Sequence, residues 1–390
     1  MKSDQRPLIL YVIGQLGVGG TERHLSQLVV QLNPKKWRIK VLSLKRGGEL
    51  ENSIRGAGIE VLAPGISQNR FIRLLKVSCF FFKVVAKHRP DVIHFFLPEA
   101  YLLGTVVSLC SFRSIRVMSR RSQNKYQQRR PILGKIERYI HRYTHAFTAN
   151  SQTVKRELIA EGVAANDIAL IYNGVKSPDE IDHEIAQGVN KTYRQSQKAV
   201  LIVMVANLIP YKGHKVLINA LRDLASYEEW QALLIGEDRG VGEQLARHVD
   251  ESGLTRRIHF LGKIENVFPY LLAADIGVLT SYEEGFSNFI IEAMSSGLPM
   301  VVTDVGGNAE AVCDGENGFV VQVGDAKQVA KRVEKLIENK DLRDRFSQAN
   351  KERATKLFAW ANCVAKYEKL YVRLLSTDAK VTINDSVLGD

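Results

Sequence analysis

Short apolar runs alternate with amphipathic stretches along nearly the whole chain, and this alternation limits the possible folds more than any other feature. Runs rich in Val, Ile and Leu favour buried strands, whereas apolar residues three or four apart favour helices. Regular alternation of the two predicts a parallel, doubly wound α/β sheet. The expected strands are Leu8–Ile13, Arg38–Leu44, Ile59–Leu62, Asp91–Phe96, Arg116–Ser119, His145–Asn150, Ile168–Tyr172, Ala199–Ala206, Ala232–Ile235, Ile258–Leu261, Ile276–Leu279, Met300–Thr303 and Gly318–Val321.

Helices are expected between these strands and near the end of the chain. They are Glu22–Leu32, Arg70–Lys87, Ala100–Ser111, Ile132–Arg142, Ser151–Glu161 and a largely helical region from Ala326 to Leu375, interrupted near Asn339 and around Phe358–Trp360. Ser151 suits a helix N-cap, because its hydroxyl can accept a bond from a backbone N–H of the first turn. The polar residues 176–197 break the alternation and are expected to form a linker. A chain of 390 residues has room for a domain of roughly 150–200 residues on either side of it.

The charges are distributed unevenly between the two halves of the chain. Residues 1–200 carry 32 Lys and Arg against 15 Asp and Glu (+17), whereas residues 201–390 carry 22 against 27 (−5). This asymmetry is typical of domains with different partners. The four cysteines are scattered without metal-binding spacing, which favours free thiols in a reducing cytoplasm. No apolar window of about 18 residues is present, and the first apolar run is too short for a secretion signal, so neither a spanning helix nor export is expected.

Two glutamates, separated by seven residues, distinguish the stretch from Asp275 to Asn308. Glu284 lies in a glycine-bearing loop after an expected strand, and Glu292 lies in a helix expected over 286–294. Such loops lie at the carboxyl edge of a parallel sheet, where ligands bind. Backbone N–H groups at the helix start suit a diphosphate, because unpaired donors and the helix dipole favour negative charge. The residues at this start are Gly285, Phe286, Ser287 and Asn288.

Glycine-rich junctions follow the first strand of each half. Lys212 and Gly213 lie where the strand after the linker meets its helix, so the lysine is placed to meet a diphosphate as a point charge. Gly17, Gly19 and Gly20 follow the first strand of the chain, but position 22 is glutamate where a dinucleotide motif needs glycine, so a nicotinamide cofactor is not expected. A tight turn and close approach to an anion or sugar both remain open there.

A known family matches the motifs in these stretches. The chain resembles the retaining glycosyltransferases of family 4 in a set of short motifs that extends over nearly its whole length. These are Gly19–Glu22, Tyr172–Val175, Lys212–Gly213, Phe260–Gly262, Glu284–Phe286, Glu292–Met294, Gly297–Pro299, Gly306–Glu310 and Gly315–Gly318. The resemblance implies two Rossmann-like domains facing across a cleft, the GT-B arrangement. It also implies metal-independent transfer from a nucleotide-diphosphate sugar with retained anomeric configuration, and no cofactor.

The resemblance also implies a division of the chain. Residues 1–180 would form the acceptor-binding domain and residues 198–358 the nucleotide-sugar-binding domain. A C-terminal helix over 359–376 would cross back to the first domain, and residues 377–390 have no core pattern and are expected to be disordered.

The resemblance assigns roles to the residues of the donor half. Glu292 would hold the ribose and Glu284 the donor sugar, while Lys212 and the amides near Phe286 and Ser287 would hold the diphosphate. Lys263 and Ile264 would lie near the base. The family's arginine before the lysine is replaced here by Asn207 in Ala206–Leu208, which shifts diphosphate binding toward Lys212 and the amides.

The acceptor half is less clearly defined by sequence. Gly19, Gly20 and Thr21 are expected on the acceptor side. His94 is a third catalytic candidate, in addition to Glu284 and Lys212. The family often has a second histidine two residues later, and this chain has Phe96 at that position. A core histidine is the other interpretation of His94.

The first half also carries a basic and aromatic signal. Residues 113–142 contain ten Lys and Arg and one acid, and residues 70–89 interleave cations such as Arg70 with apolar residues such as Phe71 and Phe80–Phe82. A basic amphipathic surface is typical of peripheral binding to anionic lipid. Phenylalanines in the core, with the cations forming a solvated face or a phosphate clamp, are the alternative. No nucleic-acid module is visible, so nucleic acid is not an expected partner.

The resulting hypothesis is a cytoplasmic enzyme, peripheral on the inner face of the cell membrane. It would move a hexose or N-acetylhexosamine from a UDP- or GDP-sugar to a lipid-linked saccharide or other membrane-associated acceptor. A soluble glycosyltransferase acting on a small acceptor and a catalytically silent sugar-binding module are the alternatives.

Overall fold

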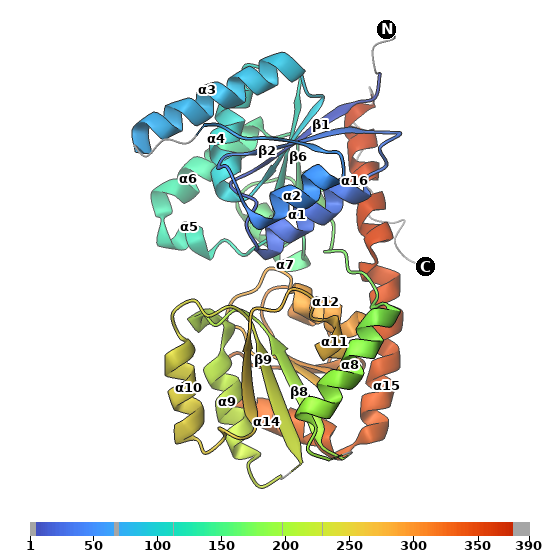
Figure 1. Cartoon of the computed structure of the whole chain (residues 1–390). Coiled ribbons are helices and arrows are strands. Elements are labelled where there is room, and N and C mark those ends of the chain that lie inside the picture. Colours follow the sequence, from blue (N-terminus) through green and yellow to red (C-terminus); the bar gives the residue numbers. More distant parts are fainter. Residues whose placement is uncertain (1–4, 66–69, 112, 197, 228, 377–390) are drawn as a thin grey trace. The chain divides into compact units, whose positions relative to one another are not determined.

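The computed structural model describes residues 5–65, 70–111, 113–196, 198–227 and 229–376 and divides the chain into two compact units (Figure 1). The first unit comprises the residues up to Asn173 together with those from Ala361 on, and the second comprises Gly174–Trp360. The boundary therefore lies before the expected end of the first domain at 180. The expected disordered tail, residues 377–390, lies outside the described residues.

The first unit contains a seven-stranded parallel sheet in the order β3-β2-β1-β4-β5-β6-β7. Its strands are β1 (Leu8–Ile13), β2 (Arg38–Ser43), β3 (Glu60–Leu62), β4 (Val92–Phe96), β5 (Ile115–Arg120), β6 (Ala146–Ala149) and β7 (Ile168–Leu170). Each was expected from the sequence to within two residues at either end. The reason is physical: both faces of this sheet are covered, so β1 and β4 are nearly continuous apolar runs and the other strands carry a short apolar segment each.

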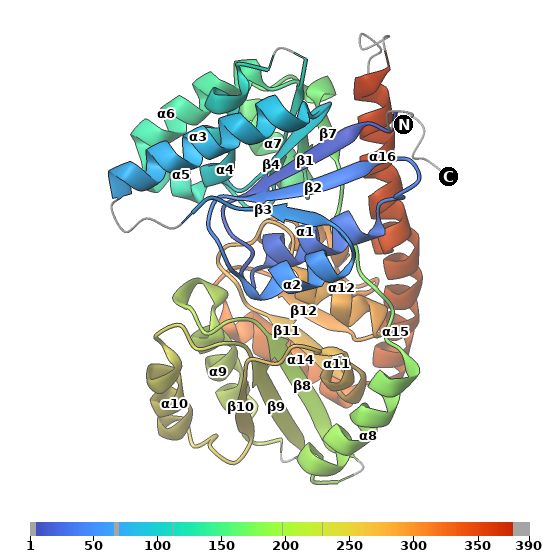
Figure 2. The ribbon, with the colours of Figure 1, turned by 45° about the horizontal axis from the view of Figure 1, so that its top comes forward.

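Helices cover both faces of this sheet. They are α1 (Gly20–Gln31), α2 (Glu49–Gly56), α3 (Arg70–His88), α4 (Pro98–Ser108), α5 (Lys125–Arg129), α6 (Pro131–Ile140), α7 (Gln152–Ala160) and α16 (Trp360–Leu375), with 3-10 turns η1 (His141–Tyr143) and η2 (Ala165–Asp167). Figure 2 shows α1 and α2 against one face of β1–β3. Side chains of α3, α4, α6 and α7 share a core with the opposite face. Ser151 caps α7 as predicted, accepting a bond from the N–H of Val154.

The second unit contains a six-stranded parallel sheet in the order β10-β9-β8-β11-β12-β13. This is the strand order 3-2-1-4-5-6 of a dinucleotide-binding fold. The strands are β8 (Val200–Val205), β9 (Trp230–Ile235), β10 (Ile258–Gly262), β11 (Ile276–Leu279), β12 (Met300–Thr303) and β13 (Gly318–Val321). The two units thus contain sheets of the same kind, which confirms the expected Rossmann-like architecture of both halves.

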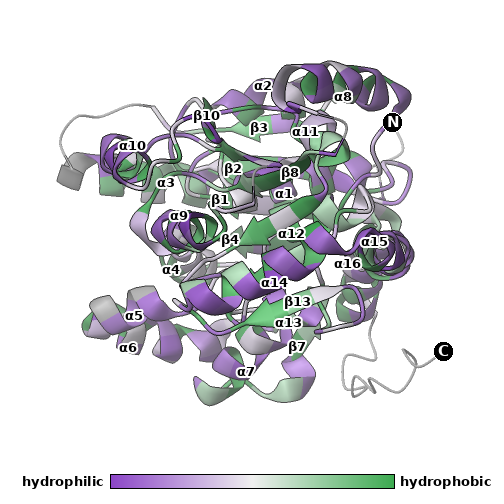
Figure 3. Cartoon of the chain, turned by 90° about the horizontal axis from the view of Figure 1, so that it is seen from below, coloured by the Kyte–Doolittle hydropathy of each residue, from purple (hydrophilic) through white to green (hydrophobic). Residues whose placement is uncertain are grey.

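The helices of the second unit include one that the sequence did not predict. They are α8 (Glu180–Tyr193), α9 (His214–Asp223), α10 (Gly242–Glu251), α11 (Phe268–Ala273), α12 (Asn288–Ser295), α13 (Asn308–Ala311), α14 (Ala326–Glu338) and α15 (Lys340–Arg353), with η3 (Pro210–Lys212) and the π-helical turn η4 (Ala354–Phe358). Figure 3 shows mostly hydrophobic strands and helices banded with hydrophilic residues.

The prediction of a linker at residues 176–197 is wrong, because most of this stretch forms helix α8. Asp179 and Asp182 form a capping box at its start, and α8 packs on α11. Asn266 donates to Asp182 Oδ1 at 2.6 Å and fixes this end of the helix to the second unit. The segment is therefore a structural part of that unit.

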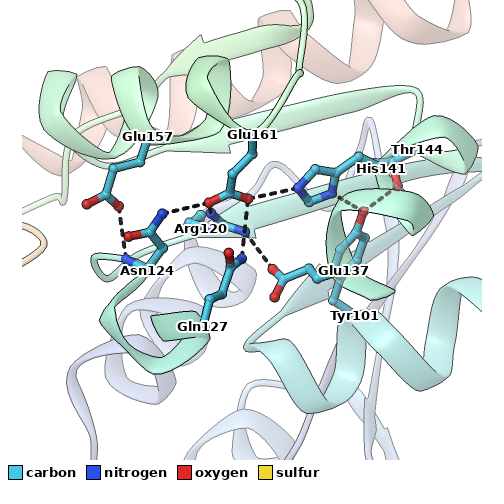
Figure 4. A network of polar contacts seen from close by, with 9 residues as sticks. All are labelled: Tyr101, Arg120, Asn124, Gln127, Glu137, His141, Thr144, Glu157 and Glu161. Atoms are coloured by element: carbon cyan, nitrogen blue, oxygen red, sulfur yellow. Dashed lines mark hydrogen bonds and ion pairs between the residues drawn. The ribbon is translucent and has the colours of Figure 1, made fainter. Parts of the chain in front are cut away.

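A buried polar network lies beyond the carboxyl end of β5 in the first unit (Figure 4). The guanidinium of Arg120 contacts Glu137 at 2.5 Å and also pairs with Glu161. Glu161 also accepts bonds from Asn124 at 2.9 Å and from His141 at 3.0 Å. These bonds to the carboxylate outweigh its burial and lower the pKa of Glu161 to about 2. The network connects β5, α6 and α7 through paired charges.

Candidate active site

The predicted donor residues lie at the switch point of the second sheet. β8 and β11 are adjacent in the middle of this sheet. From β8 the chain adds β9 and β10 toward one edge, and from β11 it adds β12 and β13 toward the other edge. Lys212 follows β8 and Glu284 follows β11, so each lies just beyond one of the two strands that border the reversal. Ligands bind at this position in open α/β sheets.

Lys212 and Glu284 form an ion pair in this position. Lys212 Nζ lies 2.6 Å from Glu284 Oε1, and the hydroxyl of Ser281 donates to the same oxygen at 2.7 Å. The Glu284 side chain is 8% exposed and that of Lys212 is 19% exposed, so both are shielded without being closed off from solvent. The carboxylate therefore holds the ammonium at the edge of the sheet, where it can meet an anion.

Two glycines make this arrangement possible. Gly213 has a φ of +74°, and a Cβ there would overlap the carbonyl oxygen of Thr280 at the end of β11. The hydroxyl of Thr280 donates to the Gly213 carbonyl at 2.9 Å, which connects the start of α9 to β11. Gly306 has a φ of +59°, and a Cβ there would overlap the carbonyl oxygen of Glu284. These approaches exclude larger residues and fix the backbone on both sides of the ion pair.

Helix α12 begins at Asn288, two residues later than the sequence predicted. Ser287 is its N-cap residue in an extended conformation, and its side chain makes no capping bond. Phe286 is buried and packs on Phe358, with ring centroids 5.4 Å apart, which fixes the approach to the helix. Gly285 accepts a backbone bond from Gly307 at 2.8 Å. The helix start is thus held beside Glu284, as the diphosphate prediction requires.

The remaining predicted donor residues lie at the same edge of the sheet. Glu292 is half-buried within α12, one turn beyond the helix start. Asn207 follows β8, and its Oδ1 accepts the N–H of Glu237 at 3.1 Å, so this side chain orders the loop after β9. Lys263 is exposed and Ile264 is half-buried, and both follow β10 at the outer edge of the sheet. Their role near the base stays a prediction.

The predicted acceptor residues occupy the corresponding place in the first unit. Gly19 is the N-cap residue of α1, and Gly20 and Thr21 open this helix, which is the next element after β1. β1 and β4 border the reversal of strand order in this sheet. No bound group tests the assignment of these three residues to the acceptor, which stays a prediction.

His94 is a core residue in this structure. It is fully buried in β4, its Nδ1 lies 2.7 Å from the hydroxyl of Tyr371, and its Nε2 lies 2.8 Å from the hydroxyl of Ser119. Burial, together with the nearby guanidinium of Arg121, lowers the pKa of His94 to about 3. A fully buried ring whose two nitrogens are both bonded within the fold favours the core interpretation of His94. Its catalytic role stays a prediction.

Sequence reasoning did not identify Ser281 or the positional role of Gly306. Ser281 is fully buried two residues after β11 and bonds to Glu284. A polar residue directly after a buried strand is a usable signal for a ligand edge. Within the described residues, no group of three or more His, Cys, Asp or Glu side chains has an arrangement that could hold a metal ion. None of the described helices combines the length and apolar character needed to cross a bilayer.

Comparison with known proteins agrees with this geometry. The model for glycosyl transferases group 1 matches residues 190–353, and that for glycosyltransferase family 4 matches residues 18–177. Together the two matches cover both units. The chain belongs to the GT-B glycosyltransferases, with the family 4 and group 1 domains in that order.

Individual relatives are distant but consistent with this family. N-acetyl-alpha-D-glucosaminyl L-malate synthase of Bacillus anthracis is 25% identical over 248 residues, which are 64% of this chain and just under two thirds (65%) of the relative. The capsular polysaccharide biosynthesis glycosyltransferase CapM of Staphylococcus aureus is 25% identical over 76% of this chain and 80% of its own length. The crystal structure of Anabaena HepE in complex with UDP matches 94% of this chain and 100% of its own, with a TM-score of 0.81 and 22% identity. At that identity the structural likeness shows a shared fold.

Proposed function

We propose that the protein transfers a hexose or N-acetylhexosamine from a UDP- or GDP-sugar to a saccharide acceptor, with retention of anomeric configuration. The observation that carries this proposal is the ion pair between Lys212 and Glu284, bonded by Ser281, in front of the α12 start. The fold is shared with HepE, whose structures contain UDP and UDP-glucose, which favours UDP as the nucleotide.

The proposed mechanism uses electrostatic stabilisation of the leaving group. As the bond to the sugar breaks, negative charge develops on the diphosphate, and the ammonium of Lys212 stabilises it. Backbone N–H groups of the α12 start add to this, aided by the helix dipole. Glu284 and Glu292 accept bonds from sugar and ribose hydroxyls. The chain supplies positive charge and oriented donors for these steps, and the proposal involves no metal ion or cofactor.

Loss of Glu292 and loss of Lys212 should separate donor binding from turnover. We expect Glu292→Ala mainly to raise the Kd of the nucleotide sugar, because it removes a ribose ligand. We expect Lys212→Ala mainly to lower kcat, because it removes charge stabilisation of the leaving group.

A thermal-shift screen across UDP- and GDP-sugars identifies the donor first, since a ligand of the native state raises the Tm. The exposed Lys215 and Glu251 provide matched controls. Wild-type donor binding and turnover in both variants would contradict the proposal.

We further propose that the acceptor is membrane-associated and that the protein binds peripherally to the anionic inner face of the cell membrane. Helices α3 and α6, which pack on either side of α4, expose six large apolar side chains. These are Leu74, Leu75, Phe82, Ile132, Ile136 and Tyr139, with the exposed cations Arg73, Lys76, Lys83, Lys87, Lys135 and Arg138 on the same two helices. Exposed apolar side chains among cations favour an anionic lipid surface.

The structure divides the phenylalanines of α3 between two roles. Phe81 is fully buried in the core and Phe80 is partly buried, whereas Phe82 is 49% exposed. Phe81, and in part Phe80, therefore belong to the hydrophobic core, which agrees with the alternative interpretation of these phenylalanines. The side chains of Arg70 and Phe71 lie outside the described ones.

Flotation tests the membrane proposal separately from catalysis. We expect the protein to float with vesicles of phosphatidylserine and phosphatidylcholine at low salt, and replacement of Leu75 and Phe82 by Ser to reduce the floated fraction. Val323→Ser removes an exposed apolar side chain from the second unit and is the matched control. If the wild type stays in the load fraction while turnover persists, the soluble alternative replaces this part of the proposal.

A further inference from the structure

Two consecutive arginines at the end of β5 have opposite surroundings. Arg120 lies in the polar network of Figure 4, where Glu137 and Glu161 compensate its charge. Successive side chains of a strand point to opposite faces, and Arg121 points toward α16. There it donates to Asn173 Oδ1 at 2.6 Å, and the hydroxyl of Tyr367 lies near it. Among the residues that the structure describes, no carboxylate is in ion-pair contact with Arg121.

The neutral partners leave the charge of Arg121 uncompensated. Burial lowers the pKa of this guanidinium, but arginine remains charged in proteins. The neighbouring groups do not supply negative charge. Burial raises the pKa values of Tyr367 and Tyr371, so both hydroxyls keep their protons. Burial and, to a lesser extent, the charge of Arg121 lower the pKa of His24, so its ring is neutral. The Arg121 side chain is half-buried, so part of its charge stays accessible to solvent and to a ligand. Among the described residues Arg121 is thus a partly exposed cation without a carboxylate partner.

A second polar group at the same place also lacks a partner. Asn150 is 1% exposed, and its Nδ2 donates to the carbonyl oxygen of Arg121 at 3.1 Å. Its Oδ1 is buried and accepts no hydrogen bond. Buried amide oxygens normally have a donor. Arg121, Asn150 and Asn173 follow β5, β6 and β7, so all three lie at the carboxyl edge of the first sheet, where ligands bind.

We propose that Arg121 binds an anionic group of the acceptor, a phosphoryl or a carboxylate. A guanidinium offers two parallel N–H groups to either anion, and Asn173 holds it in place. The inference rests on the proposed function and specifies its acceptor class, an acidic saccharide or a saccharide phosphate. It concerns the first unit alone, so it can fail while donor binding in the second unit stands.

The test measures binding to the full chain saturated with UDP, so that the donor site does not bind the probes. Calorimetry compares glucose 1-phosphate, glucuronate and neutral glucose. We expect the wild type to bind at least one anionic probe about tenfold or more tightly than glucose, and the two anionic arms to distinguish phosphoryl from carboxylate. Arg121→Gln removes this preference, Arg121→Lys retains part of it, and Arg156→Gln, which neutralises an exposed arginine of the same unit, retains all of it.

Stability and UDP binding separate the possible outcomes. Because Arg121→Gln removes an uncompensated charge, we expect its Tm to equal or exceed that of the wild type, whereas loss of a purely structural arginine would lower it. The proposal is overturned if Arg121→Gln binds the anionic probes as tightly as the wild type, if the wild type shows no preference for them, or if the variant loses UDP binding instead. Failure of the wild type to bind UDP or any other nucleotide would contradict the proposed function, which is checked first.

Discussion

Glu137 has no solvent exposure, and its role at the level of single residues is to compensate Arg120. We expect Glu137→Ala to lower the free energy of unfolding by about 3 kcal/mol, because removing one partner of a buried pair leaves the other charge less compensated. Urea denaturation measures the change. Arg247→Ala breaks the exposed pair with Glu243 and is the control, with an expected change below about 0.5 kcal/mol. Equal effects of the two variants would show that burial adds nothing at Glu137.

His94 makes the stability of the protein sensitive to acid. The unfolded chain binds a proton near pH 6.5, but the folded state does not until about pH 3, so acid favours unfolding between these values. The loss from His94 alone is about 1.4 kcal/mol per pH unit, or about 2 kcal/mol at pH 5. We expect His94→Phe to reduce this slope, measured by urea denaturation from pH 7 to pH 5, although it also lowers stability at pH 7.

The exposed His183 provides the control for this measurement. His183→Phe removes an exposed histidine and leaves the buried ones in place, so the pH dependence of the free energy of unfolding should equal that of the wild type. An unchanged slope in His94→Phe would show that other groups, such as the buried His24 and His214, account for the acid sensitivity.

Single residues at the candidate site differed in how far the sequence revealed them. Lys212 and Glu284 could be predicted to meet, because each follows a strand and the carboxyl ends of parallel strands share an edge. The bond from Ser281 and the isolation of Arg121 could not be predicted, because both depend on side-chain directions fixed by packing. His94 could not be decided either, since its solvation depends on a tyrosine 277 residues away in the sequence.

Among the helices and strands, those buried on both faces were the most predictable. β8 and β11 are continuous apolar runs. A central strand of a parallel sheet buries its side chains on both faces, so such runs favour that position. α8 was missed because a polar composition suggested a linker, although a helix on the surface needs only one apolar stripe. Its capping box, Asp179 with Asp182, was a local signal that composition concealed.

α8 can be tested as an element through its glycine. Gly188 is exposed in the middle of α8, and a Cβ there would meet nothing within 4 Å. We expect Gly188→Ala to raise the free energy of unfolding by about 0.5–1 kcal/mol, because alanine loses less backbone entropy in a helix. A linker at this position would show no gain.

Gly213→Ala is the opposite case. Its positive φ and the overlap of a Cβ with the Thr280 carbonyl predict a loss of more than about 1 kcal/mol together with a weaker donor-induced rise in Tm. A stable variant with wild-type donor binding would contradict the proposed fixing of Lys212 by the α9 start.

At the scale of the whole molecule, the two units differ in how the chain builds them. The second unit is one continuous segment, Gly174–Trp360, whereas the first needs both ends of the chain. In the first unit, α16 buries Tyr367, Leu370 and Tyr371 and bonds to His94 and Tyr11. Burial of these three side chains contributes about 2 kcal/mol each, which is a large part of the 5–15 kcal/mol that stabilises a typical domain.

Fragments test this difference. We expect residues 174–360 to unfold cooperatively on their own and to bind the donor, because the fragment keeps its whole core and the ion pair of Lys212 and Glu284. Residues 1–173 alone should lack a cooperative transition, since the surface that α16 covers would be exposed. Fusing residues 361–376 to this fragment through a flexible linker should restore the transition in circular dichroism. A cooperative transition without them would contradict the role of α16.

The use of both chain ends has a consequence for biosynthesis. β1 is synthesised before the second unit, whereas α16, which covers part of the first unit, is synthesised after it. At about 5–20 residues per second, synthesis of the chain between β1 and α16 takes roughly 20–70 s, and the first unit lacks α16 for that whole time. A message truncated directly after codon 360 would therefore yield a product whose second unit is complete and whose first unit exposes the apolar surface that α16 normally covers, a target for chaperones and proteases.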